Sequence, residues 1–187
     1  MKFLVYGVKG WIGEKVFKHL KNEGTDVVSG NCRVDNIKEL EKEIIDVQPT
    51  HVISLIGRTH GTYNNKVYGT IDYLEQPGKL VENVRDNLFS PVVLSLMAKK
   101  HNFHFTYLGT GCIFEYDNEH LYGREENGFS EDSKPNFFGS SYSIVKGFTD
   151  QLMHILDDST LNVRIRMPIT DEFNSRNFCF FSTLYFN

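Results

Sequence analysis

The sequence predicts a doubly wound parallel α/β sheet with helices on both faces, and three of its features favour this fold class. Short apolar runs rich in strand formers alternate with segments whose apolar residues repeat at helical spacing. A turn with Gly7, Gly10 and Gly13 joins the first such run to the first helical segment. Tyr142 and Lys146 lie four residues apart in a later helical segment. Strands alternating with helices form parallel sheets that bind ligands at the carboxyl ends of their strands.

Five segments are expected to form the strands of this sheet. Each is a short run of apolar, β-branched or aromatic residues bounded by glycine, proline or polar turn residues. In chain order they cover residues 3–6, 26–29, 51–56, 103–108 and 161–166.

Helical spacing of apolar residues predicts the connections between these strands. The first helix begins after Gly10 and ends at Gly24, and the second is closed by Pro49. A third helical pattern contains Pro91, which marks either a helix start or a kink. The segment 57–78 is predicted to be a long loop, and the polar segment 115–135 precedes the helix that carries Tyr142.

Composition limits the classes of function. The chain has 187 residues, of which 40% are hydrophobic, so one sizeable core and one domain are expected. A net charge of -4 and the lack of a basic run argue against nucleic acid as a partner. The apolar run before Gly7 is too short for a signal peptide or a membrane span, so a cytoplasmic protein is expected.

The cysteines and histidines show no metal-binding pattern. Cys32, Cys112 and Cys179 are odd in number and have no paired spacing, which favours reduced thiols over a disulfide framework or a zinc site. The seven histidines also lack ligand spacing. No metal is therefore expected.

The glycine-rich turn is the candidate site for a dinucleotide. Residues 7–13 (Gly7, Val8, Lys9, Gly10, Trp11, Ile12, Gly13) lie between the first strand and the first helix. Glycines let the backbone turn tightly against a pyrophosphate, whose charge is favoured by unpaired N–H groups at a helix start. An ordinary glycine-rich connection is the alternative.

The ends of the second and third strands carry the remaining cofactor candidates. No acid follows the second strand at the position typical of NAD binding, and Arg33 is available for a 2'-phosphate, which favours NADP. A solvated arginine is the alternative. Asp35 and Asn36 either contact adenine or cap the second helix. The candidates at the third strand are Leu55, Ile56, Gly57 and Arg58, near the ribose and nicotinamide, with a plain loop as the alternative.

The reacting end is predicted around Tyr142. A ketone that receives a hydride also needs a proton donor, and a phenol with a pKa of about 10 is a poor donor without a nearby cation. Lys146 is expected on the same helical face, where its ammonium would lower the pKa of Tyr142 and its other donors would hold the nicotinamide ribose. Thr110 would align the substrate carbonyl with Tyr142. An exposed amphipathic helix face is the alternative.

These motifs resemble the extended short-chain dehydrogenase/reductase superfamily, with a Rossmann-like fold. Within it they resemble the dTDP-4-dehydrorhamnose reductases and most closely the bifunctional nucleotide-rhamnose synthases, the 3,5-epimerase/4-reductases of plants and large viruses. The likeness is carried by residues 7–13, 57–61, 109–115, 134–143 and 164–169.

The resemblance implies NADPH-dependent conversion of a UDP- or dTDP-4-keto-6-deoxyglucose to the L-rhamnose nucleotide. Cys112 would take part in epimerisation, since protons next to a ketone are acidic, whereas a buried inert thiol is the alternative. Gly111 and Cys112 stand where related dehydratases have Asp and Glu, which argues against dehydration. The implied substrate contacts are Thr110, Gly111, Cys112, Asn136 and Tyr142.

The chain is expected to consist of an NAD(P)-binding domain, residues 1–176, and a divergent aromatic tail, residues 177–187. The tail resembles a truncation or a shifted reading frame, so most of the family's carboxyl-terminal substrate domain is expected to be absent. Three outcomes remain open: an active reductase, a catalytically inactive NADP-binding module that pairs with a relative, or a remnant. A homodimer through the helices containing Leu96 and Tyr142 is also open.

Overall fold

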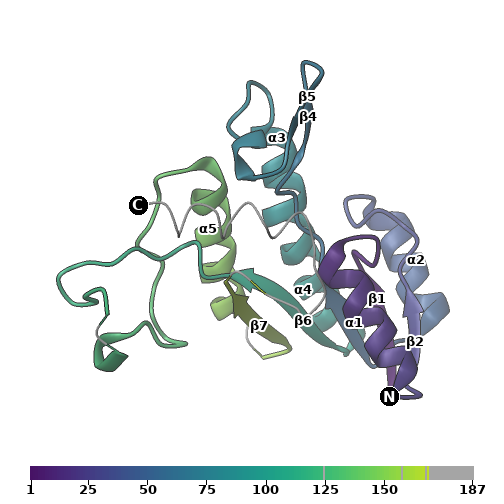
Figure 1. Ribbon diagram of the computed structural model, residues 1–187. Coiled ribbons are helices and arrows are strands. Elements are labelled where there is room, and N and C mark those ends of the chain that lie inside the picture. Colours follow the sequence, from purple (N-terminus) through teal and green to yellow (C-terminus); the bar gives the residue numbers. More distant parts are fainter. Residues whose placement is uncertain (124, 157, 167, 169–187) are drawn as a thin grey trace.

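The computed structural model describes residues 1–123, 125–156, 158–166 and 168 (Figure 1). The predicted domain boundary at residue 176 and the tail 177–187 lie outside these described residues. Among the described residues, no helix has the length and apolar character that crossing a membrane requires. The elements are β1 Lys2–Tyr6, α1 Trp11–Asn22, β2 Asp26–Ser29, α2 Ile37–Val47, β3 His51–Ser54, β4 Gly61–Tyr63, β5 Lys66–Tyr68, η1 Ile71–Tyr73, α3 Leu80–Val84, η2 Arg85–Phe89, α4 Ser90–His101, β6 His104–Thr110, η3 Glu125–Asn127, α5 Ser141–Ile155 and β7 Thr160–Ile165.

The main sheet confirms the predicted fold class. Its five strands are all parallel and follow the order β2-β1-β3-β6-β7. The strand order therefore reverses between β1 and β3, and such a reversal opens a crevice at the carboxyl ends of the strands. The topology is Rossmann-like, and the crevice lies where the sequence predicts the ligand.

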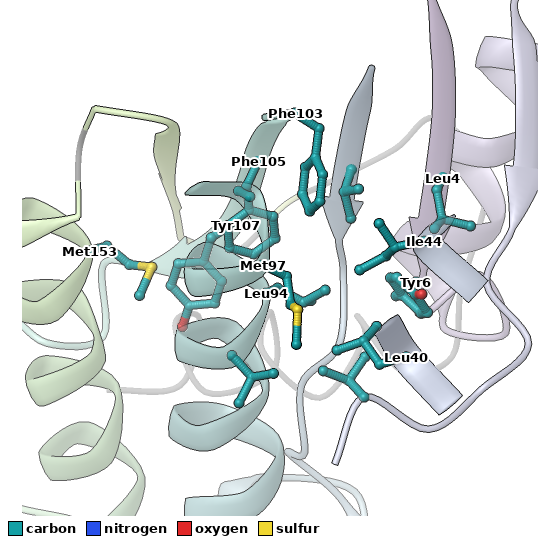
Figure 2. Packing of buried hydrophobic residues seen from close by; sticks show 14 residues of the cluster. Leu4, Tyr6, Leu40, Ile44, Leu94, Met97, Phe103, Phe105, Tyr107 and Met153 are labelled. Carbon is teal, nitrogen blue, oxygen red and sulfur yellow. The ribbon is translucent and has the colours of Figure 1, made fainter. Parts of the chain in front are cut away.

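One face of the sheet carries most of the core. Right-handed crossovers place α1 on one face and α2, α4 and α5 on the other. The main apolar cluster agrees with this, since it joins side chains of α2, α4 and α5 to the strands and includes none from α1. Figure 2 shows the aromatic rings of Phe103, Phe105 and Tyr107 close to Leu94 and Met97 of α4.

Three of the predicted segments differ most from the structure. The segment 57–78 is not a plain loop, because it contains the antiparallel hairpin β4–β5 and the short helix η1. Figure 1 shows this hairpin beside α3 and apart from the main sheet. Strand β3 ends at Ser54, two residues early, and β6 extends to Thr110 because it pairs with β7 over six residues. Pairing partners distant in sequence set these limits.

The helix around Pro91 continues through the proline. The turn before it, η2, is a π-helix between α3 and α4. Proline has no N–H to donate to the carbonyl four residues earlier, which belongs to Asn87. Thr149 of α5 donates to that carbonyl instead, with an Oγ1–O distance of 2.7 Å, and Ser90 Oγ donates to the Arg85 carbonyl at 2.9 Å. Two side-chain hydroxyls therefore donate hydrogen bonds to carbonyls of this π turn.

The turn between β1 and α1 has room only for glycine at two positions. Gly7 has a φ of +84°, and a Cβ there would lie 2.6 Å from the Leu55 carbonyl carbon. A Cβ on Gly13 would lie 2.0 Å from the Gly7 carbonyl oxygen, whereas a Cβ on Gly10 would be 3.3 Å from the same oxygen. The first turn of α1 therefore packs directly against the backbone that follows β1.

Gly13→Ala is expected to destabilise the protein, because its methyl group must displace rigid backbone. We expect the free energy of unfolding to fall by about 1–3 kcal/mol, as for an overpacked core position. Urea denaturation would measure it. Gly10→Ala is the matched control, with a smaller loss expected, and equal losses would contradict this account of the turn.

Candidate functional site

The fold brings the predicted site residues to one edge of the sheet. The glycine turn follows β1, Arg33 and Asp35 follow β2, and the segment 55–58 follows β3. Thr110 ends β6 and Cys112 lies two residues beyond it. Because the strands are parallel and adjacent, these segments border one crevice.

The glycine turn fits a dinucleotide. The backbone of Leu55 lies directly against Gly7, so the turn and the end of β3 touch. Ile56 also packs against the main core, which fixes this edge. Trp11 opens α1, and the Gly10 N-cap provides no side-chain hydrogen bond. A backbone cradle without Cβ atoms next to a helix start suits a pyrophosphate.

The loop after β2 is held by Glu43, which the sequence did not indicate. Its carboxylate accepts hydrogen bonds from the Asn31 N–H at 2.7 Å and from the Tyr6 hydroxyl at 2.7 Å. Burial raises the pKa of the neighbouring Cys32 thiol to about 12, helped by its hydrogen bond with Glu43. Cys32 is therefore a neutral packing residue, and the loop delivers Arg33 in a fixed position.

Arg33, Asp35 and Asn36 form hydrogen bonds within the chain. Arg33 Nε lies 2.8 Å from Asp35 Oδ1. Asn36 Oδ1 accepts from the Glu39 N–H at 3.5 Å at the start of α2. The capping alternative for Asn36 is therefore confirmed, while contacts of Asp35 and Asn36 with adenine stay a prediction.

Arg58 is fixed by two residues that the sequence did not indicate, Asp86 and Asn87. Asn87 Oδ1 accepts from the Arg58 N–H at 3.1 Å, and Asn87 Nδ2 donates to the Arg58 carbonyl at 3.0 Å. Arg58 Nε donates to Asp86 Oδ2 at 3.2 Å. Burial raises the pKa of Asp86, but bonds and charge from Arg85 and Arg58 outweigh it and lower that pKa overall. Asp86 is therefore a carboxylate.

Thr110, Cys112 and Tyr142 lie together at the reacting end. Tyr142 is buried in a small cluster with Tyr73 and Leu74, against which Cys112 packs. Burial raises the pKa of Tyr142 to about 12, although a side-chain hydrogen bond with Thr110 lowers it. Tyr142 is therefore a neutral phenol near pH 7.

Gly111, between Thr110 and Cys112, lies close to the Arg166 side chain. A Cβ on Gly111 would lie 3.2 Å from Cβ of Arg166. Its N–H donates to the Ile165 carbonyl at 2.8 Å. The segment that carries Cys112 is thus fixed to the end of β7.

Lys146 does not act on Tyr142 as predicted. Its Nζ donates to the Tyr107 hydroxyl and, at 3.2 Å, to the Leu108 carbonyl. Burial lowers the pKa of Lys146 to about 7. The expected lowering of the Tyr142 pKa by Lys146 is wrong for this structure, because burial dominates at Tyr142 and the amine is directed at Tyr107.

Asn136 holds the loop after β6. Its Oδ1 accepts from the Glu115 N–H at 2.9 Å, and its Nδ2 donates to the Glu115 carbonyl at 3.0 Å and to Asp117 Oδ2 at 2.9 Å. The predicted substrate contact of Asn136 stays a prediction. The contacts that this side chain makes within the chain hold the loop after β6.

The same loop is anchored by Arg164 of β7. Two of its nitrogens, Nε and Nη2, each lie 2.8 Å from an oxygen of the buried Asp150 carboxylate. The guanidinium also donates to the carbonyls of Ser130, Glu131 and Ser133. A bidentate pair of this kind fixes orientation as well as charge. Arg164 therefore holds the polar segment against α5.

The titration of Lys146 predicts a pH-dependent stability. The unfolded side chain has a pKa near 10.5 and the folded one about 7, so between these values the unfolded chain binds more protons. The folded state therefore loses no stability to Lys146 above the unfolded pKa. As the pH falls toward 7, the free energy of unfolding decreases, because the unfolded lysine takes up a proton that the buried one does not. Lys146→Met removes the cost of burying the charge.

We expect the stability of Lys146→Met relative to wild type to be greatest near pH 7 and to shrink by up to about 1.4 kcal/mol per pH unit as the pH rises toward about 9.5. Denaturation at a series of pH values measures this difference. Lys99→Met, at an exposed lysine of α4, should give a flat difference. If the difference in free energy of unfolding between Lys146→Met and wild type did not change with pH, the lowered pKa of Lys146 would be wrong.

Comparison with known proteins finds close relatives. No family model matches the chain. Protein L780 of Acanthamoeba polyphaga mimivirus is 56% identical over 178 residues, which are 95% of this chain and 60% of that protein. The crystal structure of the L780 UDP-rhamnose synthase superposes with a TM-score of 0.88 and 55% identity, covering 99% of this chain and 62% of the other.

Two further matches are more distant. The trifunctional UDP-glucose 4,6-dehydratase/UDP-4-keto-6-deoxy-D-glucose 3,5-epimerase/UDP-4-keto-L-rhamnose-reductase RHM2 of Arabidopsis thaliana is 35% identical over 179 residues, 95% of this chain and 25% of that enzyme. A dTDP-4-dehydrorhamnose reductase of Bacillus anthracis str. Ames, solved with NADP, has a TM-score of 0.72 at 18% identity, covering 93% of this chain and 57% of the other. This last likeness shows the fold alone. The chain thus spans 60% of L780 and a quarter of the plant enzyme.

Proposed function

We propose that this chain belongs to the nucleotide-rhamnose synthases of the extended short-chain dehydrogenase/reductase superfamily, and that it reduces a nucleotide-linked keto sugar with NADPH. The substrate is a UDP- or dTDP-4-keto-6-deoxy sugar in the cytoplasm. The observation that carries the proposal is the meeting of Thr110, Cys112 and Tyr142 at the carboxyl end of β6. We assign the cofactor-binding domain to residues 1–176.

The cofactor is held by the residues that border the glycine turn. Gly7, Gly10 and Gly13 form the tight turn before α1 on which we place the pyrophosphate, and we place the ribose near Arg58, which follows β3. Bound there, NADPH supplies the hydride. The cradle without Cβ atoms supports this assignment, because a side chain at Gly7 or Gly13 would clash with backbone.

Tyr142 supplies the proton that the sugar oxygen takes up as carbon 4 receives the hydride. Its pKa of about 12 keeps it protonated at neutral pH, so it enters the reaction as an acid. Thr110 shares a hydrogen bond with Tyr142 and orients the substrate oxygen toward it. Lys146 lies one helical turn away and donates to the Tyr107 hydroxyl and the Leu108 carbonyl, so we assign it to holding the end of β6 beside Tyr142.

Cys112 is placed for the epimerisation of carbons 3 and 5. It packs against the cluster that contains Tyr142, which puts the Cys112 side chain beside the proposed acid. The Cys112 carbonyl accepts a hydrogen bond from Ser143 Oγ at 2.9 Å, which fixes the backbone at this position. Protons next to a ketone are acidic enough for a positioned sulfur base to exchange them.

Reduction is tested by following NADPH absorbance after mixing the 187-residue protein with UDP- or dTDP-4-keto-6-deoxyglucose. Tyr142→Phe is expected to lower kcat/KM by at least about 100-fold, the contribution typical of a general acid. Tyr122→Phe, at an exposed tyrosine, should retain the wild-type rate.

Cys112→Ser should abolish deuterium uptake at carbons 3 and 5 of the sugar from heavy water.

A catalytically inactive NADP-binding module is the second candidate. It has the same cofactor site, and the observation that favours it is that Lys146 Nζ donates to Tyr107 and not to Tyr142. NADPH binding without any oxidation in the assay above would favour this candidate over the reductase. Oxidation that is insensitive to Tyr142→Phe would contradict the assignment of Tyr142.

A homodimer through α5 is proposed as the assembly. The exposed stripe of α5 is apolar and consists of Ile144, Phe148, Leu152 and Ile155 at helical spacing, with Leu96 exposed on the neighbouring α4. Phe148→Asp is expected to halve the mass measured by light scattering, because a charge disrupts an apolar interface. Val67→Asp, on the exposed hairpin, is the control. A wild-type mass of one chain would contradict the dimer.

A further inference from the structure

We propose that Arg85 joins Arg33 in binding the 2'-phosphate of the cofactor's adenosine, and that this pair selects NADPH over NADH. The inference rests on the proposed NADPH site and adds to it a residue from a different element of the fold. Arg33 follows β2, whereas Arg85 begins η2, 52 positions later in the chain.

The two guanidiniums border the same two carboxylates. Arg33 Nε lies 2.8 Å from Asp35 Oδ1, and Arg33 Nη2 lies 3.7 Å from Asp86 Oδ1. Arg85 Nε lies 2.8 Å from Asp86 Oδ1 and 3.9 Å from Asp35 Oδ2. Two cations that share both of their acidic partners lie side by side. An anion that reaches one of them therefore reaches the other.

The π turn places this group at the crevice. In η2 the consecutive residues Arg85, Asp86 and Asn87 all make contacts there, Asn87 with the Arg58 backbone and Asp86 with the Arg58 side chain. π turns occur frequently at functional sites, because the extra residue redirects side chains. Asp86 thus connects three arginines, since Arg58 Nε also lies 3.2 Å from its Oδ2.

The two carboxylates between the arginines, Asp86 and Asp35, differ in burial. The Asp86 side chain is 11% exposed, whereas Asp35 is 29% exposed and Arg33 is 61% exposed. Asp86 therefore holds the guanidiniums from the protein side, while Asp35 lies on the solvent side. Asp35 makes only a 3.9 Å approach to Arg85. A dianionic phosphate carries more charge than one carboxylate, so it replaces Asp35 between the two arginines.

There is space for the adenosine beside the pair. An open hollow of about 520 Å³ adjoins Asp35 and Arg85, and its other lining side chains are apolar. The lining residues are Leu80, Val81, Val84 and Phe89 together with the two charged ones. The adenine base would lie on the apolar side chains of this hollow, and the 2'-phosphate would lie next to the guanidiniums of Arg33 and Arg85.

The test compares two short probes that differ only in the 2'-phosphate, adenosine 2',5'-bisphosphate and adenosine 5'-monophosphate. Calorimetric titration of the full chain gives both dissociation constants without any turnover. In Arg85→Gln we expect the bisphosphate to bind about 10- to 100-fold more weakly, as for a lost charge-assisted hydrogen bond, with monophosphate affinity nearly unchanged. Arg33→Gln should behave similarly.

The double variant should lose less than the sum of the single losses, because both arginines bind one group. Lys21→Gln makes the same charge change at an exposed position on α1 and should leave both affinities unchanged. Arg85→Lys keeps the positive charge but lacks the planar set of guanidinium donors. It should recover part of the loss, and its monophosphate affinity reports whether the fold is intact.

Three results would overturn the inference: equal binding of the two probes by wild type, no binding of either, or an unchanged bisphosphate preference in Arg85→Gln. In the last case, a loss in Arg33→Gln would leave Arg33 as the phosphate ligand without Arg85. Failure of the reductase proposal is distinct. It would appear as an intact bisphosphate preference, dependent on Arg85, in a protein that does not oxidise NADPH.

Discussion

The hydrogen bonds of Asn87 connect the two ends of the crevice. Its side chain is bonded to both backbone groups of Arg58, and its carbonyl accepts from Thr149 of α5 at 2.7 Å. Asn87 also donates to Asn83, which donates to Ser141 at the start of α5. The cofactor end at β3 and the helix that carries the reacting residues are therefore fixed to one polar seam. Buried amides that are fully bonded in this way specify one arrangement of their neighbours.

Charge and burial divide the crevice into two regions. At the end near β2 and η2, arginines and acids pair with one another, and Arg33 is largely exposed to solvent. At the reacting end, Tyr142 and Lys146 are buried, and burial moves their pKa values in opposite directions, to about 12 and about 7. Desolvation disfavours the charged form of both groups, so the phenol stays protonated at neutral pH and the pKa of the amine falls to about 7.

Much of the architecture was readable from local sequence. The glycine turn, the second strand and the second helix lie where period and turn chemistry indicate, and the site candidates meet at one sheet edge because parallel strands align their carboxyl ends. The loop predicted at 57–78 concealed a hairpin, since short strands with few apolar residues give a weak signal. The sequence named Tyr142 and Lys146 as a pair, but not Tyr107, which accepts from the lysine.

The sequence by itself determined the class of sheet, the glycine turn at Gly7 and Gly13 and the spacing of Tyr142 and Lys146, because these depend on spacings within one strand, turn or helix. Only the tertiary structure decided which side chains set their charge and position. Glu43 accepts from Tyr6, Asp86 accepts from Arg58, and Arg164 donates to Ser130, and in each case the partner is distant in the chain. Burial and ion pairing depend on neighbours that folding brings together, and a local pattern contains no information about them.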